Sequence, residues 1–210
     1  MDWVSYTVVV LLSYLLGSIP TGYLAGRFRG IDIRSVGSGN IGATNVFRIL
    51  GKRAGAAVLA IDAFKGFAAC RFVPLLFGAA PSENLRIVAG ISAILGHNYT
   101  CWLRFKGGKG IATSAGVMLG WLPWALAIVL GCWLLVFAIS RYVSLASVIA
   151  ALALPFAAWA TQGTYRMIVI AGIVGALAIY KHRTNIQRLL NGTEHRFGIR
   201  KPSVPGHTEP

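Results

Sequence analysis

Long apolar stretches, separated by short basic or glycine-rich segments, make up most of this 210-residue sequence. Hydrophobic residues account for 56% of the chain, whereas soluble domains usually have about 45–50%. The ten-residue alternation of apolar and polar residues that is typical of membrane β-barrels is absent from the sequence. Because a helix needs about 20 apolar residues to cross a bilayer, the sequence predicts an all-α, polytopic integral membrane protein.

The apolar stretches predict seven transmembrane helices. They cover about residues 3–26, 53–79, 85–103, 110–120, 122–140, 143–162 and 164–182. The stretch from Ile111 to Ile139 is too long for one comfortable crossing and Pro123 interrupts it, so we expect two helices there, with one kinked span as the alternative. Residues 1–198 are expected to form a single membrane-embedded domain, followed by a disordered cytoplasmic tail at 199–210.

The positions of Lys and Arg predict the orientation of the chain, because these residues collect in cytoplasmic loops. Most of them lie in residues 27–53, 104–109 and 181–201. Seven spans place all three segments on one side, so we expect the N-terminus outside and the C-terminus in the cytoplasm. No Lys or Arg precedes the first apolar stretch, which is therefore expected to be a retained span and not a signal peptide.

Glycines, amides and hydroxyls fill the first cytoplasmic segment, VGSGNIGATN at 36–45. Glycines permit positive φ angles, and successive backbone N–H groups in such a loop can converge on an anion. A helix that begins near Ile41 would add a dipole that favours phosphate. With Arg34 and Arg48 on either side, the loop is interpreted as a phosphate-binding site; a flexible linker is the alternative.

The second segment, GHNYTCWLRFKGGKGIATSAG at 96–116, repeats this chemistry with Lys106 and Lys109. It is not a Walker loop, because Lys109 is followed by Gly110 in place of Ser or Thr. The alternative is a tight turn with lysines placed by the positive-inside rule. His97 is a candidate general base or hydrogen-bond donor, or it caps the end of its helix.

The third segment, KHRTNIQRLLNGTEHRFG at 181–198, has the composition of a basic helix lying on anionic lipid. A helix that only binds lipid head groups does not explain the presence of Asn185 and Glu194. The three segments share one predicted face, so we expect one composite site on the cytoplasmic side.

Acidic residues and cysteines are scarce, at six and three. They form no cluster suited to a metal ion and no CxxC pair, so neither a metal nor a cofactor is expected. The net charge of +14 comes without the interleaved aromatics of RNA-binding proteins, which argues against nucleic acid as a partner. Asp62 and Lys65 lie at i and i+3 inside a predicted span; we expect a buried ion pair, with a functional role as the alternative.

Taken together, the three segments resemble the bacterial PlsY family of acyl-phosphate:glycerol-3-phosphate acyltransferases. SIPTGYL (18–24), DAFKG (62–66) and RYVSLAS (141–147) extend the resemblance over most of the chain. It implies seven membrane helices in the bacterial cytoplasmic (inner) membrane, and activity as a monomer. It also implies transfer of a fatty acyl group from acyl phosphate to the 1-hydroxyl of sn-glycerol 3-phosphate. The products would be lysophosphatidic acid and inorganic phosphate, in the first step of phospholipid synthesis.

The resemblance also implies roles for residues at the matching positions. The acyl phosphate would be bound by Gly37, Ser38, Gly39, Asn40 and Asn45. Glycerol 3-phosphate would be bound by Arg48, Lys109 and Asn185, with support from Lys106, Gly107, Gly108 and Glu194. His97 would act beside the reacting carbonyl, although a substrate phosphate is an alternative proton acceptor. Ser38 either binds or, as a weaker alternative, attacks as a nucleophile.

A transporter of phosphate or phosphorylated solutes is the alternative from another class, because it would also place cations and broken helices around an anion. Such a protein should show internal repeats and a polar path to the outer face. The sequence shows no convincing repeat, and its anion-binding chemistry lies at one predicted face. A non-catalytic membrane partner is a third possibility, which leaves the three segments unexplained.

Overall fold

The computed structural model describes residues 3–162 and 164–198, and every regular element in these ranges is a helix. The α-helices are α1 (Trp3–Ser18), α2 (Thr21–Arg27), α3 (Ala43–Leu50), α4 (Lys52–Phe72), α5 (Glu83–Asn98), α6 (Ile111–Trp121), α7 (Pro123–Ser140), α8 (Val143–Gln162), α9 (Tyr165–Lys181) and α10 (Arg183–Leu190). Two short 3-10 helices, η1 (Val73–Phe77) and η2 (Cys101–Leu103), follow α4 and α5.

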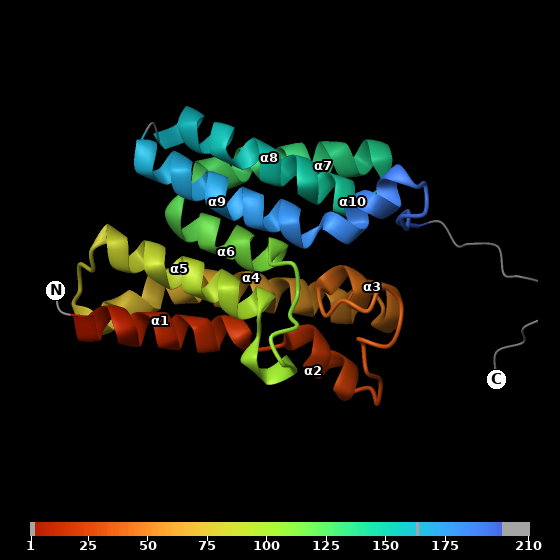
Figure 1. Ribbon diagram of the computed structural model, residues 1–210, viewed down its shortest axis with the longest axis horizontal. Helices are drawn as coiled ribbons and strands as arrows, with labels where there is room; N and C mark the ends of the chain where they lie inside the picture. Colours follow the sequence, from red (N-terminus) through yellow and green to blue (C-terminus); the bar gives the residue numbers. More distant parts are fainter. Residues whose placement is uncertain (1–2, 163, 199–210) are drawn as a thin grey trace, which may run out of the picture.

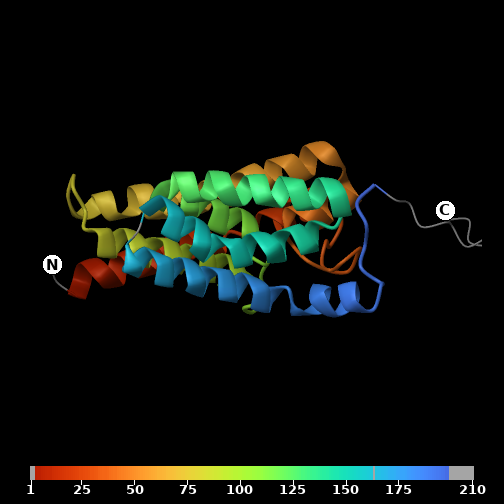
Figure 2. The same cartoon turned by 90° about the horizontal axis from the view of Figure 1, so that it is seen from above.

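The long helices lie side by side along the long axis of the molecule (Figures 1 and 2). In Figure 1, α1 and α5 lie on one side of α6, and α8 and α9 lie on the other. α1 packs along α5, α4 along α6, and α8 between α7 and α9. The largest buried apolar cluster joins α5 and α6 to α8 and α9, so the two groups of helices share one core.

Prolines set two of the breaks between helices. Pro20 lies between α1 and α2, and its ring leaves no backbone N–H to continue a helix. α6 ends at Trp121 and Pro123 begins α7, at the first helical position that proline favours. The prediction of two helices between Ile111 and Ile139 is therefore confirmed, and the alternative of one kinked span is wrong.

Within the described residues, three helical segments are long and apolar enough to cross a membrane: Trp3–Arg27, Pro123–Ser140 and Val143–Thr161. A fourth is added if α9 and α10, which meet at a bend of 58°, form one broken span. α5 and α6, at 16 and 11 residues, are shorter, and α4 carries charges along its length. The predicted count of seven spans stays a prediction.

Glycines allow α4 and α6 to approach closely. A Cβ at Gly66 would overlap the carbonyl oxygen of Thr113, and one at Gly116 would overlap that of Ala63. Small residues of this kind let two helix backbones come into direct contact. The contact holds the first turn of α6 beside the middle of α4, where Asp62 lies.

Candidate active site

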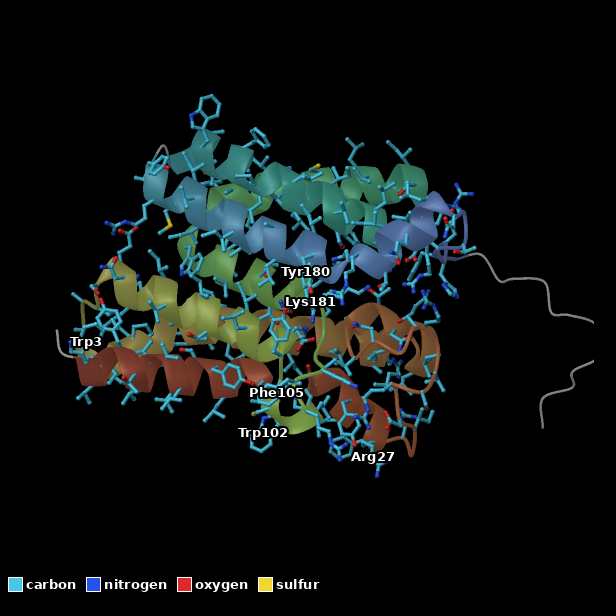
Figure 3. All side chains as sticks on the ribbon, in the orientation of Figure 1. Trp3, Arg27, Trp102, Phe105, Tyr180 and Lys181 are labelled. Atoms are coloured by element: carbon cyan, nitrogen blue, oxygen red, sulfur yellow. The ribbon has the colours of Figure 1, made fainter. Side chains whose placement is uncertain are left out.

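The three segments singled out in the sequence meet around one cavity of about 160 Å³. Eight of the predicted site residues line it: Ser38, Asn40, Asn45, Arg48, His97, Lys109, Asn185 and Glu194. In Figure 3, nitrogen-bearing side chains gather at the end of the bundle that carries α2, α3 and α10. The fold thus brings together one composite site, rich in cations and amides, from segments far apart in the chain.

Asn45 fixes the shape of the first loop. Its side chain is 2% exposed; Oδ1 accepts a hydrogen bond from Ser38 N–H (2.9 Å), and Nδ2 donates to the carbonyls of Ile33 and Val36 (3.1 Å each). Gly37 has φ +62°, and a Cβ there would overlap Asn45 Oδ1. The loop therefore needs glycine at this position and Asn45 beneath it.

Two helix N-termini lie at the cavity wall. Residues 42–44 at the start of α3 and residues 110–112 at the start of α6 both line the cavity. The helix predicted near Ile41 begins at Ala43. Backbone N–H groups and the positive end of the dipole favour an anion at each terminus.

A chain of hydrogen bonds joins the second and third segments. Lys109 Nζ donates to Asn185 Oδ1, and Asn185 Nδ2 donates to Glu194 Oε1 (2.7 Å). Glu194 also accepts from Ser144 Oγ (2.9 Å) and Arg188 Nε (2.7 Å). Glu194 is therefore the centre that holds α10 and α8 around Lys109.

Burial and these contacts shift the pKa values of Lys109 and Glu194. Burial, with the nearby cations of Arg188 and Arg48, lowers the pKa of Lys109 to about 8, although Glu194 opposes the shift. Burial alone would raise the pKa of Glu194, but hydrogen bonds from Arg188, Asn185 and Ser144 hold it below its ordinary value. At neutral pH the cavity therefore contains a lysine cation close to its titration range and a carboxylate that stays ionised.

The predicted ion pair between Asp62 and Lys65 is confirmed, with 2.8 Å between Asp62 Oδ1 and Lys65 Nζ, both side chains being buried. Asp62 also lines the cavity and lies 3.6 Å from His97 Nδ1. An acid on α4 thus faces His97 on α5. The two residues lie too far apart in the sequence for a short motif to link them. Among the described residues, no group of three or more His, Cys, Asp or Glu side chains is placed to hold a metal ion.

Other predicted residues lie outside the cavity lining. Lys106 is exposed, whereas Gly107 and Gly108 donate their N–H groups to the carbonyls of Asn98 and His97. Gly39, with φ +69°, shapes the first loop. Arg34, which flanks that loop, pairs instead with Asp32 at 2.6 Å.

Sequence reasoning assigned no site role to four lining residues, namely Ser144, Ser147, His182 and Arg188, and gave Asp62 a functional role only as the alternative to an ion pair. Two signals in the sequence pointed toward them. Ser144 and Ser147 belong to the RYVSLAS stretch, and the two basic residues at 182 and 188 lie in the third segment.

A second, apolar cavity of about 220 Å³ adjoins the first. Side chains of α6, α7, α8 and α9 line it, and nearly all of them are apolar. Five residues line both cavities: Leu59, Ile111, Ala112, Trp133 and Ser147. A cavity that carries cations and amides thus adjoins an apolar one, an arrangement that suits a ligand with an anionic head and a hydrocarbon tail.

The profile of the family described as "Glycerol-3-phosphate acyltransferase" matches residues 7–192 of this chain. The chain belongs to this family. A glycerol-3-phosphate acyltransferase of Desulforudis audaxviator is 48% identical over 96% of this chain and 100% of its own length. One from Chlorobaculum parvum is 41% identical over 93% and 99%.

Solved structures place the chain in the PlsY branch of the glycerol-3-phosphate acyltransferases. PlsY in its glycerol 3-phosphate form is 41% identical and superposes with a TM-score of 0.86, over 92% of this chain and 96% of that one. Its lysophosphatidic acid form is 40% identical with a TM-score of 0.83 over the same shares. PlsY is described as an integral membrane protein, in agreement with the apolar helices found here. The membrane class and the family predicted from the sequence are confirmed.

Proposed function

We propose that this protein transfers a fatty acyl group from acyl phosphate to the 1-hydroxyl of sn-glycerol 3-phosphate, yielding lysophosphatidic acid and inorganic phosphate. Family membership supports acylation of glycerol 3-phosphate. The single observation that carries the rest of the proposal is that the cationic cavity adjoins the apolar one and shares lining residues with it. Such a reaction is the first step of phospholipid synthesis.

Glycerol 3-phosphate is assigned to the side of the cavity formed by Arg48, Lys109 and Asn185. Lys109 and Asn185 already contact one another, so an incoming phosphate would find a cation and an amide fixed side by side. Arg48 adds a guanidinium, which suits the paired oxygens of a phosphate. The solved PlsY structures, in glycerol 3-phosphate and lysophosphatidic acid forms, support this acceptor.

The acyl phosphate head is assigned to residues 37–40, with Asn45 holding the loop from below. The loop lies next to the N-terminus of α3, which favours a second anion. The hydrocarbon chain would then run into the apolar cavity between α6 and α8. Ser38 is exposed at the cavity wall, and we assign it to binding the head group, not to nucleophilic attack.

The reaction needs alignment and charge stabilisation more than strong acid–base chemistry. An acyl phosphate is already activated: the 1-hydroxyl oxygen bonds to the carbonyl carbon, the bond from that carbon to the phosphate oxygen breaks, and phosphate leaves. Cations and N–H donors stabilise the negative charge that develops on both oxygens. The hydroxyl proton is assigned to the phosphate oxygens, because His97 Nδ1 faces Asp62 and its Nε2 edge lies against Gly108.

The protein is proposed to act as a monomer in the bacterial inner membrane, with its N-terminus outside. The basic cavity residues then face the cytoplasm, where phosphorylated metabolites and acyl donors are available. Basic residues concentrate at that end of the bundle, as the positive-inside rule requires.

A phosphate-release assay tests the donor directly. Purified protein in detergent is supplied with glycerol 3-phosphate and, in parallel, palmitoyl phosphate, palmitoyl-CoA or palmitoyl acyl carrier protein. We expect lysophosphatidic acid and equimolar phosphate from palmitoyl phosphate alone. Product from a thioester would contradict the proposed donor. A folded protein that yields no product from any donor would instead favour transport of phosphorylated solutes, tested by uptake into vesicles.

A further inference from the structure

Asp62 is a buried charge to which the proposed reaction gives no role. It is 1% exposed in the middle of α4, and Lys65 is 3% exposed beside it. Burying such a pair costs desolvation, and well-packed apolar residues often stabilise a fold equally well. The Asp62 carboxylate also accepts a hydrogen bond from Thr21 Oγ1 at the start of α2, while Lys65 Nζ donates to the carbonyl of Ile19 (2.8 Å). The carboxylate is therefore fixed from two sides.

His97 lies between this carboxylate and the glycine loop at residues 107–110. Its Nδ1 is 3.6 Å from Asp62 Oδ1, within ion-pair distance but longer than a hydrogen bond. On the other edge of the ring, a Cβ at Gly108 would overlap Nε2. The carbonyl of His97 also accepts the Gly108 N–H at 3.0 Å. The imidazole is thus held between a fixed carboxylate and the loop backbone.

The loop is in close contact with the ring and with the backbone at the end of α5. Gly107 N–H donates to the Asn98 carbonyl at 3.2 Å, and a Cβ at Gly107 would overlap the His97 carbonyl oxygen. Lys109 follows directly and contacts Asn185 in the cavity. The position of the Lys109 ammonium therefore depends on where the His97 ring lies.

We propose that Asp62 is a positioning residue: through His97 it sets the glycine loop 107–110 and so places Lys109 for the phosphate of glycerol 3-phosphate. The kinetic part of its test rests on the proposed function, whereas the position of the loop does not. If Lys109 binds the phosphate of glycerol 3-phosphate equally in the ground state and in the transition state, displacing it raises KM and leaves kcat little changed. An effect on a catalytic base would lower kcat instead.

The decisive variant is D62N/K65M, which removes both buried charges while keeping the sizes of the side chains. D62N alone leaves Lys65 buried without its acid and is expected to fold poorly. In D62N/K65M we expect the KM for glycerol 3-phosphate to rise about 10- to 100-fold, as for the loss of one hydrogen bond to a charged group, with a much smaller change in kcat. H97N should raise KM similarly, and D62N/K65M/H97N should raise it no further, because both changes act through one contact.

Hydrogen exchange measured by mass spectrometry supplies a readout independent of turnover. The peptide covering residues 104–112 should exchange faster in D62N/K65M and H97N than in the wild type, with the other helices unchanged. E83Q, which removes an exposed acid at the far end of α5, is the matched control and should match the wild type in both measurements.

Two kinetic outcomes would overturn the inference. A wild-type KM in D62N/K65M would mean that Asp62 only offsets the charge of Lys65. A loss of kcat at unchanged KM would make Asp62 the orienting partner of a His97 base. Unchanged exchange in residues 104–112 would also overturn it. If the wild type shows no acyl transfer while exchange still increases in the variants, the positioning role stands and the proposed function fails.

Discussion

At the scale of single residues, the cavity contains one cation that stays charged and one that titrates near neutral pH. Arg48 carries a guanidinium, which does not lose its proton in proteins, whereas the pKa of Lys109 is lowered to about 8. Lys109 is also the group in hydrogen-bond contact with Asn185. The pH dependence of substrate capture should therefore report on Lys109.

We expect kcat/KM for glycerol 3-phosphate to fall as the pH rises through about 8, because the free enzyme then loses the Lys109 proton. The substrate phosphate is already a dianion there, since its second pKa is about 6, so its own titration is complete. Bound phosphate stabilises the ammonium, which should move the fall in kcat to higher pH. Initial rates between pH 6.5 and 9.5 measure both profiles.

The variant K109R tests whether the alkaline fall in kcat/KM comes from Lys109 or from another group. Arginine keeps its proton over the whole range, so the alkaline fall in kcat/KM should disappear, whatever the new KM. An unchanged fall in K109R would assign it to another group and contradict the role proposed for Lys109.

At the scale of helices and loops, prolines, glycines and apolar stretches in the sequence predicted most of the elements. They did not predict which residues of different elements come into contact. Pro123 marks the break between α6 and α7, and the glycine loops lie ahead of α3 and α6 as expected. The predicted span at 53–79 instead ends as α4 at Phe72 and continues as η1. The approach of Asp62 to His97 depends on how α4 packs against α5, which neither helix encodes alone.

The apolar cavity gives a prediction at this scale. Ala115 on α6 lines it and is partly buried, so A115L should shorten the space for a hydrocarbon chain. We expect kcat/KM for palmitoyl phosphate to fall roughly tenfold relative to octanoyl phosphate, the lower end of the discrimination that one or two methylenes give in an apolar pocket. The KM for glycerol 3-phosphate should stay constant. Phosphate release with each donor measures the ratio.

A127L provides the matched control, because Ala127 is exposed on α7 and lies outside the cavity lining. It should leave the ratio of the two donors at the wild-type value. An equal loss with both donors in A115L, or no loss with either, would argue against the apolar cavity as the site of the acyl chain.

At the scale of the whole molecule, the position of each helix in the bundle explains why hydropathy alone finds only some of the predicted spans. α7 has a single buried residue, Ala125, and its other side chains are free to face lipid. Ten of the sixteen residues of α5 are buried, and α4 holds Asp62 and Lys65 inside the bundle. Helices surrounded by other helices need fewer apolar residues, because protein and not lipid covers them.

Seven crossings and an external N-terminus predict which loops a membrane-impermeant reagent can reach. Residue 79, between η1 and α5, should lie outside, and residue 191, after α10, should lie in the cytoplasm. The free cysteines Cys70, Cys101 and Cys132 are first replaced by alanine. In intact spheroplasts an impermeant maleimide should then label A79C, whereas N191C should react only after the membrane is permeabilised.

The two reporters together distinguish seven spans from other counts. Both are exposed in the fold, so both should react fully in detergent, which controls for burial. Labelling of both from outside would require an even number of crossings between residues 79 and 191, so that one of the five spans predicted between them would not cross the membrane. Labelling of N191C alone would invert the molecule, placing Lys109 and the cationic cavity outside, away from cytoplasmic glycerol 3-phosphate. An inverted molecule would therefore contradict both the proposed orientation and the proposed substrate.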